Sequence, residues 1–313
     1  MAVNYIDIKK FHRVMLIYNR NSGKQLFASM NMKINEIYKH LKAFLGSEVI
    51  ELCEIRRFAE VESLVERAVA EKIDWVIIAG GDGTIRAVIE RFSNKGHMPY
   101  ISIVPAGTVN LVAKELLLAN DPSKWIKRIL KGIEIPVYLG RCNGHVFLTV
   151  TGIGFDSLVV DNVSEKEKKL LSKAAYAWEG AELLRKEMLF SNWRYRFKIR
   201  FDEEEEWYEA ASIIVGKSRY YAGHYNLFRD ASLSKPLLHI AYFKGATRAD
   251  FASYATCIAL ESLGLNKNII VRTAKKLEIV CQQGEFPAEL DGDVLTMAPL
   301  KIALEETPVK FLA

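Results

Sequence analysis

The segment at residues 80–84 reads Gly-Gly-Asp-Gly-Thr, a combination that can hold a phosphate group. Its glycines leave the backbone bare and permit positive φ, so a phosphate oxygen can approach main-chain N–H groups and the positive end of a following helix. Thr84 can cap that helix or contact a phosphate oxygen. The carboxylate of Asp82 would repel a phosphate unless it holds a cation or accepts a proton. The alternative for this segment alone is a tight turn capped by the aspartate.

Two further segments repeat this layout. Residues 105–110, Pro-Ala-Gly-Thr-Val-Asn, place glycine and threonine after the next strand and before a helix. Residues 19–24 end the first strand with small polar residues and the cation Lys24. Because parallel strands in α/β proteins present their carboxyl ends at one edge, where ligands bind, these segments predict a cradle for a nucleotide polyphosphate.

The first half of the chain alternates strand and helix patterns, which positions these segments. Apolar β-rich runs alternate with stretches whose apolar residues recur at helical spacing. This alternation predicts an α/β domain with a parallel sheet. The expected strands are 13–18, 49–52, 74–79 and 100–104, and the expected helices are 25–45, 59–70, 85–92 and 110–118.

The pattern changes near Pro136, where we place the domain boundary. Short strand patterns follow, interrupted by two helices at about 164–186 and 249–263. They predict an antiparallel β domain with helical excursions. The expected strands are 136–141, 145–151, 193–201, 208–217, 237–243, 269–273 and 276–281.

One of these strands has a charged face. Four cations (Arg194, Arg196, Lys198 and Arg200) alternate with aromatic residues and Ile199, so period two places all the cations on one side. We favour a solvated face whose charge is balanced by the acidic turn at 202–206. The alternative is a contact surface for anionic lipid headgroups.

Composition restricts the classes of protein to which the chain can belong. Of 313 residues, 50% are apolar and 26% are charged, which is typical of a globular protein and excludes a mainly disordered or fibrous chain. The net charge of +5 weakly favours anionic partners, but it is modest and no nucleic-acid-binding motif accompanies it.

Cysteine spacing and hydropathy indicate a location. Four cysteines lie far apart without a CxxC pair, which favours a reducing compartment. No run approaches the ~20 apolar residues of a spanning helix, and the first residues lack the apolar region of a signal peptide. We therefore expect a cytoplasmic protein, with any membrane contact peripheral and at the inner face.

Three motifs together resemble the diacylglycerol kinase catalytic family, and more narrowly its soluble bacterial lipid kinases. They are GGDGT at 80–84, PAGTVN at 105–110 and TGIGFD at 151–156. This group is related in fold to sphingosine kinases and NAD kinases. The resemblance implies an NAD kinase-like α/β nucleotide domain, a C-terminal β-sandwich domain that binds lipid, and an active site in the cleft between them. The implied domains are 1–135, completed by 300–313, and 136–299.

The resemblance also implies the reaction and its residues. It implies transfer of the γ-phosphate of ATP to a lipid hydroxyl with Mg²⁺, and Asp82 would organise a water and metal network. Residues 289–293, Glu-Leu-Asp-Gly-Asp, resemble the family's Asp-Gly-Glu catalytic segment, although in isolation we would prefer a β-turn. Asp291 and Asp293 are the catalytic candidates for the base that accepts the hydroxyl proton. The expected nucleotide-binding residues are Asn19, Ser22, Gly23, Lys24, Gly80, Gly81, Gly83, Thr84, Gly107, Thr108 and Asn110.

The chain departs from the family pattern at several positions. Ala87 and Leu111 stand where the family often has Glu and Asp, and no threonine ends the second strand at 53–55. Lys235 stands where many bacterial members carry an aspartate of a structural magnesium loop. An ammonium cannot ligate a cation, so we expect that secondary metal site to be absent and Lys235 to supply positive charge there.

The leading hypothesis is therefore an ATP-dependent lipid kinase that works at the membrane surface, with diacylglycerol as the default acceptor. Other lipid alcohols stay open. One alternative is an NAD kinase, which shares GGDGT, although PAGTVN and TGIGFD fit lipid kinases better. Another is a nucleotide-binding regulator that has lost catalysis, suggested by the departures at Ala87, Leu111 and Lys235. A homodimer is the default assembly for such a protein, and we expect no nucleic-acid partner.

Overall fold

The computed structural model describes residues 4–20, 27–157, 196–223 and 225–313. The chain forms two compact units, one of residues 1–137 and 307–313, the other of residues 138–306. Sequence analysis placed these boundaries at 135 and 300. The difference at the second boundary arises because the strand at 300–304 pairs within the second unit, so only the last residues return to the first.

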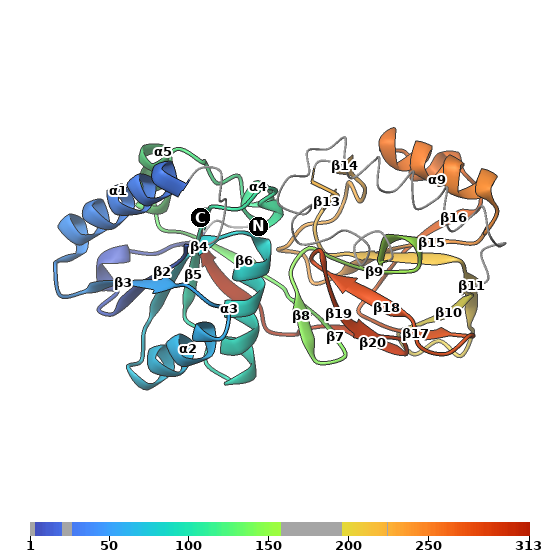
Figure 1. Ribbon diagram of the computed structural model, residues 1–313, viewed down its shortest axis with the longest axis horizontal. Coiled ribbons are helices and arrows are strands. Elements are labelled where there is room, and N and C mark those ends of the chain that lie inside the picture. Colours follow the sequence, from blue (N-terminus) through green and yellow to red (C-terminus); the bar gives the residue numbers. More distant parts are fainter. Residues whose placement is uncertain (1–3, 21–26, 158–195, 224) are drawn as a thin grey trace. The chain divides into compact units, whose positions relative to one another are not determined.

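The first unit is an α/β structure built on a seven-stranded sheet (Figure 1). Five neighbouring strands pair in parallel, and the strand at 133–137 pairs antiparallel with both of its neighbours, the strands at 4–5 and 309–312. In sheet order the strands are β1 (Asn4–Tyr5), β6 (Ile133–Val137), β21 (Val309–Leu312), β5 (Tyr100–Pro105), β4 (Trp75–Gly80), β2 (Val14–Asn19) and β3 (Ile50–Ile55).

Helices cover both faces of this sheet. Helices α1 (Phe27–Leu45) and α5 (Pro122–Ile129) pack together on one face, and α2 (Glu60–Ala70) and α3 (Asp82–Asn94) pack together on the other (Figure 1). Every residue of β4 is buried, as its continuous apolar run predicts for a strand covered on both sides. This unit also contains α4 (Leu111–Glu115) and a short 3₁₀ helix at Ile8–Lys10.

The second unit is a sandwich of two antiparallel six-stranded sheets. One sheet has the order β11 (Tyr208–Ala210), β10 (Phe197–Phe201), β17 (Lys276–Cys281), β20 (Leu300–Leu304), β7 (Gly140–Cys142) and β8 (His145–Phe147). The other has the order β16 (Ile269–Ala274), β15 (Leu238–Phe243), β12 (Ser212–Gly216), β9 (Val150–Ile153), β18 (Pro287–Leu290) and β19 (Asp293–Met297). Both sheets contribute residues such as Phe147, Phe197 and Ile240 to one hydrophobic core, as a sandwich requires.

Smaller elements complete the second unit. Helix α9 (Arg248–Ala259) begins with a capping box from Thr247 to Asp250 and packs Phe251 and Tyr254 against the second sheet. A two-stranded hairpin joins β13 (Tyr220–Tyr221) to β14 (Tyr225–Asn226), and a short 3₁₀ helix spans Leu263–Leu265. The helix expected at 164–186 lies outside the described residues. The fold class expected from the sequence, α/β followed by a β-sandwich, is confirmed.

The basic face expected on the strand at 193–201 is only partly described, and at Arg200 the charge is balanced by a residue outside the acidic turn. Arg200 pairs with Glu278 on β17 at 2.7 Å and stacks over the Trp207 ring. The acidic turn serves other partners: Asp202 accepts hydrogen bonds from the backbone N–H groups of 275 and 276, and Glu204 pairs with Arg272. The cross-strand partner is the better one because it lies directly opposite Arg200 in register.

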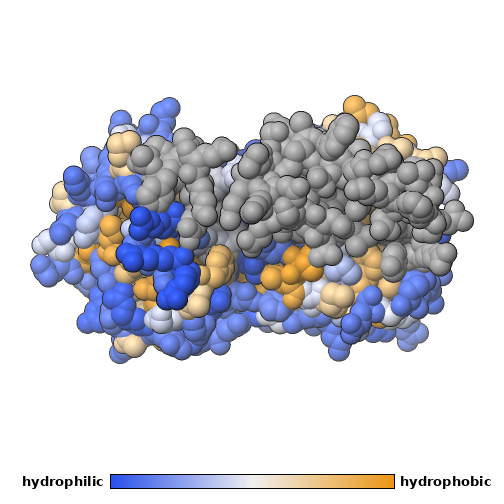
Figure 2. Space-filling model, in the orientation of Figure 1, coloured by the Kyte–Doolittle hydropathy of each residue, from blue (hydrophilic) through white to orange (hydrophobic). Residues whose placement is uncertain are grey.

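The surface carries no broad apolar face in the part that Figure 2 colours, where small hydrophobic patches alternate with hydrophilic residues. Exposed large apolar side chains occur singly in both units, for example Leu117 and Leu265. No helix within the described ranges is long and apolar enough to cross a bilayer.

Candidate active site

The carboxyl ends of β2, β4 and β5 meet at one edge of the first sheet, as the sequence predicts. Gly80 pairs with Pro105 at the last position of β4 and β5. The Asn19 side-chain amide, at the end of β2, donates a 2.9 Å hydrogen bond to the Thr84 hydroxyl, and both side chains are buried. Ser22, Gly23 and Lys24 lie outside the described residues.

Asp82 connects the two glycine-containing segments. It is the first residue of α3, and its carboxylate accepts hydrogen bonds from the N–H groups of Leu111 (3.0 Å) and Val112 (3.2 Å) at the start of α4. The carboxylate therefore caps the N-terminus of a helix other than its own, a position where negative charge is favourable. It is partly exposed, so a ligand can still reach it.

Two local expectations need correction: Thr84 is not the cap of the helix, and the glycines do not adopt positive φ. Gly81 is the N-cap of α3, and Thr84 lies three residues further on, with its hydroxyl engaged by Asn19. Neither Gly81 nor Gly107 has a positive φ. These glycines are required for space: a β-carbon at Gly107 would lie 2.5 Å from the Gly81 Cα, and one at Gly80 would lie 2.7 Å from the Thr84 Cβ.

We predict that Gly107→Ala destabilises the first unit by about 1–3 kcal/mol, because the added methyl group would force the two loops apart. Thermal or urea unfolding measures this effect. The matched control is Gly264→Ala, where no atom lies within 4 Å of the added carbon and φ is not positive. Equal stability of the two variants would contradict the close contact between the loops.

Asn110 fixes the shape of the second loop. It has a left-handed backbone (φ +55°), and its side chain forms two hydrogen bonds of 2.7 Å with the backbone of Gly107, one in each direction. Asparagine tolerates this conformation better than most residues. The neighbouring Thr108 is exposed, so its hydroxyl is available to a ligand.

Lys33 on α1 is a residue of this edge that sequence reasoning missed. Its ammonium donates to the Pro105 carbonyl (2.7 Å) and to the Asn120 side chain (2.6 Å), and it is 9% exposed. Burial lowers the pKa of Lys33 to about 8, although Asp121 opposes the shift. Lys33 thus ties α1 to the end of β5. In the sequence, the pattern of the amphipathic helix does not distinguish Lys33 from the surface lysines around it.

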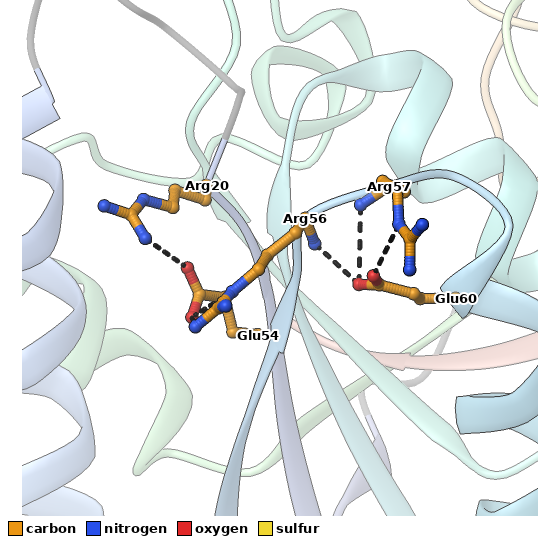
Figure 3. A network of polar contacts seen from close by, with 5 residues as sticks. All are labelled: Arg20, Glu54, Arg56, Arg57 and Glu60. Atoms are coloured by element: carbon orange, nitrogen blue, oxygen red, sulfur yellow. Dashed lines mark hydrogen bonds and ion pairs between the residues drawn. The ribbon is translucent and has the colours of Figure 1, made fainter.

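A polar pocket of about 250 Å³ lies beside the ends of β2 and β3. Its lining includes Tyr18, Arg20 and Glu54 from the strand ends and Asn31 and Asn35 from α1. Figure 3 shows Arg20 and Arg56 on either side of Glu54, at 3.4 and 3.1 Å, and the neighbouring ion pair between Arg57 and Glu60. Glu54 thus occupies the strand end at which the resemblance implied a threonine, and the pocket offers donors and acceptors to a polar ligand.

In the second unit, Asp291 is held by four hydrogen bonds. Its oxygens accept from the N–H groups of Leu148 (2.8 Å), Thr149 (2.8 Å) and Val150 (3.1 Å), and from the Thr149 hydroxyl (2.5 Å). Asp291 and Gly292 both have positive φ, at +50° and +87°, and form the turn between β18 and β19. Asp293 begins β19 and is partly exposed. The segment at 289–293 is therefore a hairpin turn, clamped to β9 through Asp291.

Two family models match the chain. The model described as diacylglycerol kinase catalytic domain matches residues 13–142. The model described as YegS C-terminal NAD kinase beta sandwich-like domain matches residues 149–312, which is more than half of the chain. The chain belongs to the diacylglycerol kinase family. Membership identifies it as a lipid kinase, an ATP-dependent phosphotransferase with an alcohol acceptor.

Relatives in the diacylglycerol kinase family match over most of their length. Diacylglycerol kinase of Bacillus subtilis (strain 168) is 26% identical over 288 residues, which cover 92% of this chain and 91% of the relative. That of Staphylococcus carnosus (strain TM300) is 27% identical over 281 residues, with 90% and 88% covered. A crystal structure of a diacylglycerol kinase from Bacillus anthracis str. Sterne has a TM-score of 0.76 at 23% identity over 97% of each chain, which shows a common fold.

This member of the diacylglycerol kinase family differs at the positions that the sequence singled out. Ala87 is buried inside α3, next to Arg86, which pairs with Glu90 at 3.5 Å. Leu111 contributes its backbone N–H to Asp82 while its side chain is buried. Both replacements are therefore accommodated by packing around the intact Asp82 contact.

The loop at 230–237 is held by two lysines. The buried ammonium of Lys217 donates to the carbonyls of Ser232 and Lys235, each at 2.6 Å. Lys235 is exposed, and its ammonium donates to the Asp230 carbonyl at 2.7 Å. Three carbonyl oxygens thus face positive charge, as they would around a bound cation, and the sequence had indicated only Lys235.

We predict that this loop is independent of divalent metal and dependent on Lys217. Lys217→Met should lower the free energy of unfolding by about 2–4 kcal/mol, because it removes two charge-assisted hydrogen bonds and leaves each carbonyl with only a backbone N–H as donor. EDTA or Mg²⁺ should not shift the unfolding temperature of the nucleotide-free protein. The control is Lys301→Met at an exposed lysine of the same unit. Stabilisation by Mg²⁺ alone, with Lys217→Met neutral, would contradict this prediction.

Proposed function

We propose that this lipid kinase transfers the γ-phosphate of ATP to the hydroxyl group of diacylglycerol. The observation that carries the proposal is the pair of glycine loops joined by Asp82 at the carboxyl edge of a parallel sheet, where a phosphate can approach the backbone. Curated relatives named diacylglycerol kinase, matched over most of both chains, support this acceptor.

In this proposal the first unit binds the nucleotide. Gly81, Gly107 and Thr108 line its phosphates, while Asn19 and Asn110 hold the loops in shape. Because phosphoryl transfer needs positioning and neutralisation of charge more than covalent chemistry, a rigid edge of this kind is suited to it.

Mg²⁺ would accompany the ATP phosphates. No group of three or more His, Cys, Asp and Glu side chains that could hold a metal occurs among the described residues. This fits Mg²⁺, which usually keeps several waters and binds through one or two carboxylates plus substrate phosphates. Each oxygen of Asp82 accepts one backbone N–H, and an ionised carboxylate has about four lone-pair sites, so Asp82 can also accept from a metal-bound water.

The second unit supplies the base. Asp293 accepts the proton of the lipid hydroxyl group. At the same time the hydroxyl oxygen forms a bond to the γ-phosphorus, and the bond from that phosphorus to the ADP oxygen breaks. We assign this role to Asp293 because all four hydrogen bonds of Asp291 are to the backbone and hydroxyl at 148–150, which makes Asp291 an anchor. The acceptor lies in a bilayer, so the enzyme would work peripherally at the membrane surface.

The test is transfer of labelled γ-phosphate from ATP with four acceptor conditions: diacylglycerol in phospholipid vesicles, an extracted lipid mixture, NAD, and no acceptor. The expected product is labelled phosphatidic acid, formed with the diacylglycerol vesicles and with neither NAD nor the acceptor-free control. Labelled NADP would replace the proposal with the NAD kinase alternative. ATP binding without any labelled product from an extracted lipid mixture would favour a regulator that has lost catalysis.

A further inference from the structure

Two acidic side chains are buried together in the second unit, at a place that the proposed reaction does not use. Asp156 follows β9 in the TGIGFD motif, and Glu289 lies on β18, the strand beside β9 in the same sheet. Asp156 is 7% exposed and Glu289 is 2% exposed. Carboxylates are almost never buried to this degree without compensation, so the arrangement requires an explanation.

Each carboxyl group has one oxygen with a donor and one without. The Tyr221 hydroxyl donates to Asp156 Oδ1, and the Gly292 N–H donates to Glu289 Oε2 at 2.8 Å. The remaining oxygens, Asp156 Oδ2 and Glu289 Oε1, are buried and accept no hydrogen bond. If both groups were ionised, two buried negative oxygens would be left without any partner.

The two remaining oxygens converge above Gly152. This glycine is directly opposite Glu289 in the pairing of β9 with β18. A β-carbon at Gly152 would lie 2.5 Å from Asp156 Oδ2 and 3.3 Å from Glu289 Oε1. Both oxygens therefore occupy the space that any other residue would fill with its side chain, and the first glycine of the motif is required for that space.

The surroundings favour one proton on the pair. Among the described residues, the other titratable groups that interact with the pair are Tyr221, Asp291 and Cys142, none of them a cation. Burial raises the pKa of Asp156, and burial with the neighbouring Asp156 raises that of Glu289 well above its usual range. Burial and Glu289 also raise the pKa of the Cys142 thiol to about 12, which keeps it neutral. A protonated Glu289 donating to an ionised Asp156 satisfies both remaining oxygens.

The pair is connected directly to the proposed catalytic turn. Gly292, whose N–H binds Glu289, lies between Asp291 and Asp293. Both central residues of the turn have positive φ, which is uncommon for a non-glycine residue such as Asp291 and needs support from its surroundings. Asp291 secures one side of the turn through β9, and Glu289 secures the other.

We propose that Tyr221, Asp156 and Glu289 form a hydrogen-bonded chain, with one proton between the two carboxyl groups, that positions the turn carrying Asp293 for phosphoryl transfer. Asp156 and Glu289 are positioning residues, since they act through Gly292 rather than on the substrate. The role in transfer rests on the function proposed above, whereas the shared proton rests on the geometry of the second unit alone.

The decisive comparison is between Glu289→Gln and Glu289→Ala. Glutamine can repeat both contacts, because its carbonyl accepts from Gly292 and its amide donates to Asp156, so kcat should stay within about twofold of wild type. Alanine removes both contacts, and kcat should fall by about 10- to 100-fold with KM for ATP unchanged, as a small displacement of a reacting group can cause. Glu278→Gln, which alters the ion pair with Arg200, is the control and should leave kcat unchanged.

Infrared spectroscopy tests the proton independently of activity. Wild type should show the C=O stretching band of a protonated carboxylic acid at neutral pH, shifted in D₂O, and Glu289→Gln should lack it. A wild-type spectrum without this band would overturn the shared proton. An equal loss of kcat in the glutamine and alanine variants, with both folded, would overturn the positioning role. If wild type transfers no phosphate to any lipid, the proposed function and the positioning role fail together, while the band still decides the shared proton.

Discussion

Asp82→Asn is expected to lower kcat/KM for phosphoryl transfer by about 10²- to 10³-fold, the range found when a preorganised electrostatic contact is lost from an active site. Asparagine has nearly the same shape but no charge, so it attracts the cation that accompanies ATP, and the water bound to it, far less strongly. Its single oxygen can accept from only one of the N–H groups of Leu111 and Val112. The measurement is steady-state transfer of labelled phosphate from ATP to diacylglycerol vesicles.

A stability measurement separates the loss of the negative charge from the loss of a hydrogen bond to the start of α4. The N–H group left without an acceptor should reduce the free energy of unfolding by about 1–3 kcal/mol, too little to unfold the protein. The matched control is Asp121→Asn, the same change at the N-cap of α5, where Asp121 accepts from the Lys124 N–H at 2.8 Å. Asparagine is as good an N-cap as aspartate, so the control should keep both stability and activity. Full activity in Asp82→Asn would contradict the assignment.

The elements of the first unit could be predicted from the sequence because its strands are buried on both faces. A continuous apolar run such as the one at 74–79 has few alternatives when glycine-rich turns and helical patterns surround it. The predicted helix at 85–92 begins earlier, at Asp82. Helix starts are hard to locate in a sequence without a serine, threonine, asparagine or aspartate cap, and here the cap is Gly81.

The strands at 287–304 could not be predicted as readily. Pro287 and Glu289 weaken the strand pattern of β18, although Glu289 points to a buried carboxyl partner rather than to solvent. We interpreted the Asp-Gly pair at 291–292 mainly as a catalytic segment. The pair is also the strongest short signal for a hairpin, and the structure has that hairpin.

The candidate site shows the same division between local and distant information. The sequence shows locally that a glycine loop follows each of β4 and β5. Because parallel neighbouring strands end at the same edge of a sheet, the meeting of these loops could be predicted. The contact between Gly81 and Gly107 and the capping of α4 by Asp82 depend on how the two loops are placed in three dimensions. A single sequence does not show this placement. The contacts of Lys33 and of Glu289 likewise join residues far apart in the chain.

Asp293→Asn is expected to lower kcat by about 10²- to 10⁴-fold while leaving stability nearly unchanged, since general-base contributions fall in that range. Asp291→Asn should mainly lower stability rather than kcat. Asparagine offers one oxygen where the aspartate carboxylate receives four donors, so we expect a loss of at least about 2 kcal/mol of stability. Thermal unfolding and single-turnover phosphate transfer, measured on both variants, show whether each residue contributes mainly to stability or mainly to catalysis.

The conservative variant Asp293→Glu sharpens this distinction. Its carboxylate retains the basic group and matches the length of the glutamate that the resemblance implies at this position, so transfer should persist within about tenfold of wild type. A base that acts through its carboxylate tolerates this change, whereas an aspartate needed only for the β19 backbone would not discriminate between asparagine and glutamate. Loss of turnover in folded Asp291→Asn together with full turnover in Asp293→Asn would reverse the two roles. In that case the four hydrogen bonds of Asp291 would orient a base rather than anchor a turn.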